Sequence, residues 1–177
     1  MVEMAQFEKV SFEQFKKDVL ENILDGETAT EETLRQIYDS IQLPMQSTSG
    51  SAGNDFTSFC WFRLAPKQTV VVPTGIKVYM EPGWFLGLYP RSSLGFKYRL
   101  QLDNTVGIID QDYYNNPKNE GHIIIRITND SHEKDNILTI GPGDKFAQGI
   151  FQPYGVVYNN KAEGTRLGGF GSTDENK

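Results

Sequence analysis

Residues 69–89 read TVVVPTGIKVYMEPGWFLGLY and indicate the structural class more firmly than any other part of the chain. They contain three short runs rich in β-branched and aromatic residues, at 69–73, 76–80 and 84–89. Each run is too short for an ordinary helix. The turn sequence Glu-Pro-Gly at 81–83 separates the second run from the third. This spacing predicts strands joined by turns.

Four further runs of the same kind follow, at 105–109, 122–128, 137–140 and 146–153. Turn residues separate them, as in the sequence Gly-Pro-Gly-Asp at 141–144. No helix of ordinary length fits between the runs, which makes a parallel sheet with crossover helices improbable. From Asp55 onward the sequence therefore predicts a mainly β fold, a sandwich or a barrel.

The first 40 residues differ from the rest in charge and in periodicity. They hold ten acidic and four basic residues, so the whole net charge of −6 lies in this segment. Ser11 and Gln14 fit a capping box, and the apolar residues that follow recur at helical spacing. Thr28 and Glu31 fit a second cap, and Pro44 stops the second helix. The segment is predicted to form two short acidic helices.

These observations divide the chain into three parts. Residues 1–45 are expected to form an acidic helical extension packed on the core, and residues 46–163 a β domain, with a flexible loop at 46–53. Residues 164–177 are expected to form a flexible, glycine-rich C-terminal arm. The apolar stripe of the helices suits packing against the β domain, and a protein partner for the acidic extension is the alternative.

Composition excludes several classes of protein. With 17 basic against 23 acidic residues in 177, the chain is not expected to bind nucleic acid directly. The apolar runs are too short to span a bilayer, so a soluble, cytoplasmic protein is expected. Cys60 has no second cysteine for a disulfide, and only His122 and His132 could join it in a metal site or a nucleophilic relay. Zinc and Cys-His chemistry are therefore not expected.

Three polar segments could carry chemistry. In residues 90–95 an arginine, two serines and turn amides could converge on a phosphate, although the same sequence suits a solvated turn. Asp110 follows two large aliphatic residues, so it could be a partly desolvated general base or could cap a turn. Near the C-terminus, glycines flank Phe170, which offers a stacking face, and Ser172 and Thr173 add hydroxyls.

Five motifs occur in order along the chain. They are Ala-Gly-Asn-Asp at 52–55, Pro-Arg-Ser-Ser-Leu-Gly at 90–95, Val-Gly-Ile-Ile-Asp-Gln-Asp-Tyr at 106–113, Gly-Asp-Lys-Phe-Ala-Gln at 143–148 and Gly-Gly-Phe-Gly-Ser-Thr at 168–173. In this order they resemble the motifs of the trimeric dUTPase family, over about residues 37 to 173. The acidic helices lie mostly outside the resemblance, and residues 114–121 make a longer hairpin tip than is usual in the family.

The resemblance implies a fold and an activity. Members of the family are β-barrel or jelly-roll subunits that form homotrimers with active sites between subunits. With Mg²⁺ they cleave dUTP to dUMP and pyrophosphate, which limits uracil incorporation into DNA and supplies dUMP for dTMP synthesis. By similarity, Asp110 is the base that deprotonates the attacking water, and Gln148 holds that water or the phosphates. Ser92 contacts the phosphate chain near the scissile bond, and Asp55 reaches the metal through water.

The same resemblance implies the residues that bind the substrate. They are Arg91 and Ser93 beside Ser92; Asn104, Gly107, Ile108 and Ile109 around the uracil; Tyr113 under the deoxyribose; and Arg166, Phe170, Ser172 and Thr173 from the C-terminal arm. A tight hairpin backbone can select uracil, because its fixed N–H and C=O groups match one base and leave no room for the thymine methyl. Tyr113 would crowd out a ribose 2′-hydroxyl, and Phe170 would close over the base.

Two other functions stay open on the sequence alone. A dCTP deaminase of the same fold would need a glutamate base in the strand after the hairpin, where this chain has Arg126. A regulatory, nucleotide-sensing protein on the same scaffold could engage a partner through its active-site surface or its acidic helices. Asp110, Gln148 and Phe170 argue against a purely non-catalytic role.

Overall fold

A computed structural model describes residues 3–23, 29–160 and 164 of the chain, and the mainly β class is confirmed. The strands are β1 (Ala5–Lys9), β2 (Met45–Gln46), β3 (Asn54–Thr57), β4 (Phe62–Leu64), β5 (Thr69–Pro73), β6 (Ile76–Met80), β7 (Trp84–Pro90), β8 (Leu100–Leu102), β9 (Gly107–Ile109), β10 (Ile124–Asn129), β11 (Leu138–Ile140) and β12 (Lys145–Pro153). The helices are α1 (Phe12–Asn22), α2 (Glu31–Ser40), α3 (Ser92–Tyr98) and a 3-10 turn, η1 (Gln111–Tyr113).

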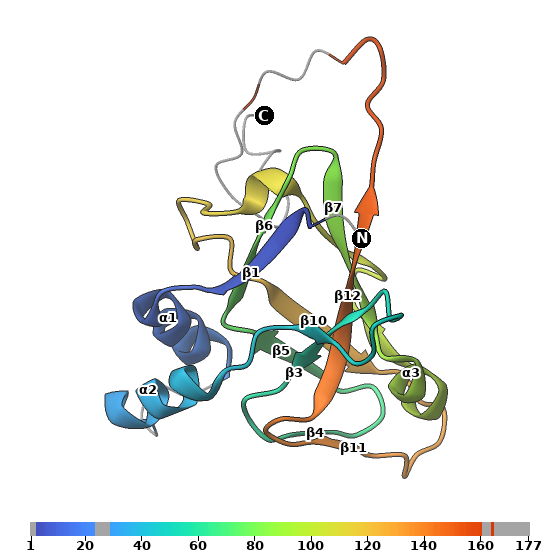
Figure 1. Cartoon of the computed structure of the whole chain (residues 1–177). Coiled ribbons are helices and arrows are strands. Elements are labelled where there is room, and N and C mark those ends of the chain that lie inside the picture. The colour runs from blue at the N-terminus through green and yellow to red at the C-terminus, as the bar shows by residue number, and fades with distance from the viewer. Residues whose placement is uncertain (1–2, 24–28, 161–163, 165–177) are drawn as a thin grey trace, which may run out of the picture.

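The largest sheet has the strand order β2-β3-β12-β7-β9. The long strand β12, orange in Figure 1, runs antiparallel to β3 on one side and to β7 on the other. Strand β7 in turn pairs with β9, with Leu88 opposite Gly107. Four of the five sequence motifs therefore lie on or beside the strands of one sheet.

The other strands close around one core of buried apolar side chains. They form the sheets β5-β10-β8, β11-β4 and β1-β6. In β10 the alternation is plain, because Ile125 and Ile127 are buried while Arg126 is exposed. Phe146 of β12 and Met80 of β6 have no exposed surface and meet in the same core. Each such side chain contributes about 1.5–3 kcal/mol of hydrophobic stabilisation, so the core holds the sheets together.

The helices α1 and α2 lie side by side on one flank, blue in Figure 1. The Ser11 hydroxyl caps α1 as expected, by accepting from the Gln14 amide. Phe15 is fully buried and packs edge-on against Phe59 of the β domain, with ring centroids 5.3 Å apart. No helix among the described residues is long and apolar enough to cross a membrane.

The N-cap of α2 was misassigned from the sequence. Its cap is Thr30, whose hydroxyl accepts from the Thr33 amide, and the helix begins at Glu31. Thr28 lies outside the described residues. The prediction was wrong because Thr28 and Thr30 both precede acidic residues. The sequence pattern does not show which of the two adopts the extended cap conformation.

Several strands differ from the prediction. Strand β1 was expected to be part of a helical extension, yet residues 5–9 pair antiparallel with the whole of β6. The strand expected at 105–109 begins only at Gly107, because Thr105 has a left-handed backbone with φ 64°. The loop expected at 46–53 begins one residue late, since β2 includes Gln46. Strands β3, β4 and β8 have three or four residues each, which is too short for a periodic signal.

Candidate functional site

The largest sheet brings three motif segments to one end of β12. Gln148 of β12 lies opposite Asp55 of β3 on one side and opposite Tyr89 of β7 on the other. The Gln148 side-chain amide donates to the Pro90 carbonyl at 3.1 Å. The segments 52–55, 90–95 and 143–148 therefore meet there, although paired residues of β3 and β12 are up to 95 positions apart in the chain.

Asp55 is the buried centre of an ionic cluster. Its carboxylate is 8% exposed and lies 2.7 Å from the Arg91 guanidinium and 2.9 Å from the Lys145 ammonium. The Ser47 hydroxyl also donates to it, at 2.6 Å. Burial opposes ionisation, but these hydrogen bonds and cations outweigh it and hold the pKa of Asp55 below its usual value. We define Asp55, Arg91, Lys145 and Gln148 as the phosphate-side group, because two ordered cations and an amide suit an oxyanion.

Gly53 is required by the position of Gln148. A Cβ atom on Gly53 would lie 2.4 Å from the Gln148 Oε1 atom, well inside van der Waals contact. A larger residue at position 53 would therefore displace this amide. Glycine in the first motif thus leaves the space that the Gln148 side chain of the fourth motif occupies.

Residues 90–95 do not form the tight turn expected from their sequence. Arg91 is the N-cap of α3, and Ser92 and Ser93 are exposed in its first turn. Leu94 and Tyr98 are spaced four residues apart and pack against the core, which explains why this short segment coils. The two hydroxyls and the Arg91 side chain are thus held at the start of a helix.

A pocket of about 410 Å³ lies between the turn that links β8 to β9 and strand β10. The hairpin expected here is not formed, because β8 pairs with β10 and β9 with β7. Its lining contains five of the residues expected to bind substrate: Asn104, Gly107, Ile108, Ile109 and Tyr113. The turn is tight, because the Val106 amide donates to the Asn104 carbonyl at 2.7 Å and the Thr105 amide donates to the Leu102 carbonyl at 2.9 Å. Backbone groups around the pocket are therefore fixed in place.

Asp110 and Tyr113 follow this segment directly. Asp110 is the N-cap residue of η1, and its carbonyl accepts from the Tyr113 amide at 3.1 Å. Tyr113 is 6% exposed, and its hydroxyl donates to the His122 carbonyl at 3.2 Å and accepts from Asn119 at 2.7 Å. Asp110 occupies the cap position of η1, but its side chain makes no cap hydrogen bond there. Tyr113 is anchored at both its backbone and its hydroxyl.

The described candidate residues thus do not all meet at one place, and Asp110 follows the pocket lining in sequence without lining the pocket itself. Among the described residues that line the pocket, none belongs to the phosphate-side group or to Ser92 and Ser93. Arg166, Phe170, Ser172 and Thr173 lie outside the described residues. Arg126 also lines the pocket and pairs with Asp103 at 2.7 Å, so the place where a deaminase would need a carboxylate holds a paired cation.

Three residues at the site were not predicted to act there. Lys145 and Ser47 both bind the Asp55 carboxylate. Lys145 lies in the fourth motif, so its spacing could have suggested it, whereas Ser47 belongs to a segment expected to be a flexible loop. His122 was considered only as a partner of Cys60 in a metal site or a nucleophilic relay, but it is fully buried and lines the pocket.

The described residues offer no preformed cage for a metal ion. They contain no group of three or more His, Cys, Asp or Glu side chains placed to hold one. Asp55, the expected outer ligand, already binds Arg91 and Lys145. Such a donor set fits a hard cation that arrives with oxygen ligands of its own and meets the protein through water.

Comparisons with known proteins agree with this geometry. A family model described as dUTPase matches residues 39–173. A deoxyuridine 5′-triphosphate nucleotidohydrolase of Lactococcus lactis is 42% identical over 135 residues, which cover 75% of this chain and 88% of that protein. One from Legionella pneumophila is 40% identical over 146 residues, covering 78% and 90%.

Solved structures give the same result. The dUTPase from Streptococcus mutans superposes with a TM-score of 0.58 at 39% identity, covering 67% of this chain and 90% of that one. The dUTPase from phage phi11 of Staphylococcus aureus reaches a TM-score of 0.62 at 19% identity, covering 92% and 97%, and shows likeness of fold. A variant of that phage enzyme coordinates a structural Mg(II) ion. On its motifs, its sheet and these relatives, the chain belongs to the dUTPase family.

Proposed function

We propose that this protein hydrolyses dUTP to dUMP and pyrophosphate. The observation that carries the proposal is the pocket lined by the turn and strand at 104–109. Asp110 and Tyr113 follow this segment directly in the chain. A fixed backbone can match the donor and acceptor pattern of uracil, and a carboxylate next to it can take a proton from water. The names of the relatives support the same substrate. A cytoplasmic location is part of the proposal, and it is supported by bacterial relatives of the same enzyme family.

Each group of residues has a part in this reaction. Asp110 orients and deprotonates the water that attacks the α-phosphorus, so that the bond to the pyrophosphate oxygen breaks. Gln148, Arg91 and Ser92 stabilise the charge that develops on the phosphate oxygens. Tyr113 packs under the deoxyribose, and the C-terminal residues Arg166, Phe170, Ser172 and Thr173 complete the site, with Phe170 over the base.

Mg²⁺ is proposed as the cofactor. The triphosphate would supply most of its ligands, and Asp55 would reach it through water, as a hard cation with oxygen ligands allows. When bound, the ion neutralises charge on the phosphates. Hydrolysis should therefore stop in excess chelator and return when Mg²⁺ is added.

The proposal is tested by pyrophosphate release from dUTP, dTTP, dCTP and UTP. Strong preference for dUTP is expected, together with a loss of about a hundredfold or more in kcat for Asp110→Asn at little change in dUTP affinity. Asp112→Asn is the matched control, since it removes the same charge two residues away in the same motif. Near-normal turnover in Asp110→Asn would contradict its role, and conversion of dCTP to a uracil nucleotide would favour the deaminase.

The protein is also proposed to act as a homotrimer with shared active sites. Two observations support this: the pocket and the phosphate-side group are separate in one chain, and Trp61 and Phe96 are 73% and 91% exposed. Light scattering should give about three times the 20.0 kDa of one chain. Co-expression of Asp110→Asn with Gln148→Ala should restore activity that neither variant has alone, because a mixed trimer contains one intact site. Monomers, or no restoration, would argue against sharing.

A further inference from the structure

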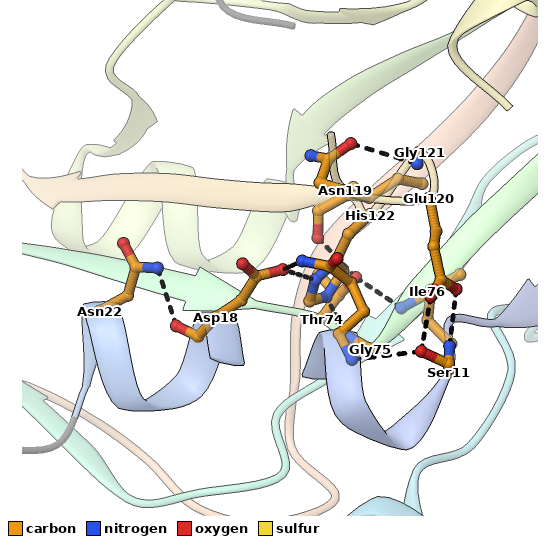
Figure 2. Close-up of polar contacts among 12 residues, drawn as sticks. Ser11, Asp18, Asn22, Thr74, Gly75, Ile76, Asn119, Glu120, Gly121 and His122 are labelled. Carbon is orange, nitrogen blue, oxygen red and sulfur yellow. Dashed lines mark hydrogen bonds and ion pairs between the residues drawn. The ribbon is translucent and has the colours of Figure 1, made fainter. Parts of the chain in front are cut away.

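Helix α1 and the loop at 114–121, which precedes β10, bind each other. At the start of α1, the Ser11 amide and hydroxyl both donate to the Glu120 carboxylate, at 2.8 and 2.5 Å (Figure 2). Nearby, the Tyr114 hydroxyl donates to Glu8 of β1 at 2.8 Å. Residues 114–121 are therefore held by the N-terminal segment as well as by their own turn.

At the centre of this contact lies the buried pair of Asp18 and His122. Figure 2 shows the His122 ring between the Asp18 carboxylate of α1 and the backbone of Gly75. The Gly75 amide donates to His122 Nε2 at 2.7 Å, so Nε2 carries no proton and Nδ1–H donates to Asp18 at 2.5 Å. The ring is fully buried and Asp18 is 5% exposed. Both ring nitrogens are satisfied only while α1 is docked.

The backbone of His122 leads from this pair to the substrate pocket. Its carbonyl accepts from the Tyr113 hydroxyl, and its amide donates to the Asn119 carbonyl at 2.9 Å. Asn119 in turn donates to the same hydroxyl. Gly121 lies so close to Tyr113 that a Cβ there would meet the Tyr113 carbonyl at 2.4 Å. A shift of His122 would therefore move the Tyr113 ring.

We propose that Asp18 is a positioning residue for sugar recognition. From α1, its carboxylate holds the His122 ring in place, and the His122 backbone in turn holds Tyr113 in the wall of the pocket. The inference rests on the proposed function, in which Tyr113 packs under the deoxyribose and excludes a 2′-hydroxyl. It gives the N-terminal helix a part in specificity. A helix that only adds stability would not affect the choice between deoxyribose and ribose.

The test compares selectivity in the full-length protein. For Asp18→Ala we expect the KM for dUTP to rise and the ratio of kcat/KM between dUTP and UTP to fall about tenfold, as for the loss of one ordering hydrogen bond, with kcat nearly unchanged. Asp18→Asn keeps an oxygen that can accept from His122 Nδ1–H, so it should retain most of the selectivity. His122→Gln keeps an acceptor for the Gly75 amide but loses the link to Asp18, and should behave like Asp18→Ala even if the latter folds poorly.

Leu34→Ala is the matched control. Leu34 is buried in α2 at 1% exposure, so its removal should lower the melting temperature through a cavity without touching His122. Unchanged selectivity in this variant is expected. If it loses as much selectivity as Asp18→Ala, or if Asp18→Ala and His122→Gln both discriminate like the wild type, the proposal is overturned.

Binding of dUMP and UMP by calorimetry separates this inference from the proposed function. If the wild type hydrolyses no dUTP, the proposed function fails, while the ratio of dUMP to UMP affinity still reports on Tyr113. A ratio that falls in Asp18→Ala supports the inference, and a ratio that stays constant refutes it. Nitrogen NMR of labelled histidine should also show His122 protonated on Nδ1 alone, and protonation on Nε2 would contradict the arrangement.

Discussion

Gly53→Ala should reduce activity with little loss of stability. The new Cβ would lie 2.4 Å from Gln148 Oε1, so the Gln148 amide has to move away from the Pro90 carbonyl. The atom that must yield is the end of a flexible side chain, and the folded state loses about one hydrogen bond, or about 0.5–1.5 kcal/mol. If the amide stabilises charge in the transition state, its displacement should cost about 10²–10³ in kcat.

The assay pairs urea unfolding with pyrophosphate release from dUTP. Gly50→Ala is the control from the same loop, since a Cβ at Gly50 meets nothing within 4 Å, and it should leave both measurements unchanged. Wild-type kcat in Gly53→Ala would refute the role of Gln148 in its observed position. If Gly53→Ala lowered the free energy of unfolding by several kcal/mol, the structural reasoning would be refuted, because the backbone and not a side chain would have moved.

Three further predictions concern stability and reactivity. Gly75→Ala should lower the free energy of unfolding in urea by about 2–5 kcal/mol, since φ is +76° and a Cβ would lie 2.5 Å from the Ile41 side chain. Gly83→Ala is the control, because φ is +90° but no atom lies near its Cβ, and it should cost only about 1–2 kcal/mol. Equal losses in the two variants would contradict the contact with Ile41. Burial opposes ionisation of Asp18, but hydrogen bonds from His122 and Gln14 hold its pKa below 3.8. The stabilisation by the Asp18 carboxylate is therefore complete above about pH 4 and is lost as the pH falls through the folded-state pKa. In Asp18→Asn the free energy of unfolding should depend less steeply on pH in that range, and an unchanged slope would contradict this. Burial raises the pKa of the Cys60 thiol, so a thiol reagent should react slowly until the protein is unfolded, and fast reaction of the native protein would disagree.

The fold was predictable where hydrophobic runs are long enough to show a period. The runs at 69–73 and 76–80 match β5 and β6 residue for residue. Burial alternates along β6, whereas β5 is marked by its three consecutive valines. Strand β1 was missed for the opposite reason. It has charged residues at Glu8 and Lys9 and follows the charge pattern of the helices, and its pairing partner lies some 70 residues away. Local sequence carries no record of such a pairing.

The candidate site was predictable as a set of motifs but not as a geometry. Asp55 and Gln148 were named from their motifs, and the structure places them opposite each other. Their ties to Ser47 and Lys145 come from strand register, which residue spacing does not give. The part of His122 was missed for a related reason, because its partner Asp18 lies 104 residues earlier in a segment outside the resemblance.

The pairing of β1 with β6 also determines how the acidic surface is presented. Among the described strands, β6 has β1 as its one ladder partner, and the acidic helix α1 follows β1 after two residues. The negative charge on α1 and α2 is therefore attached to the core at a set orientation, unlike that of a tethered tail. A cationic molecule approaching this flank would meet a fixed charge pattern, and binding there would cost little ordering entropy on the side of this protein.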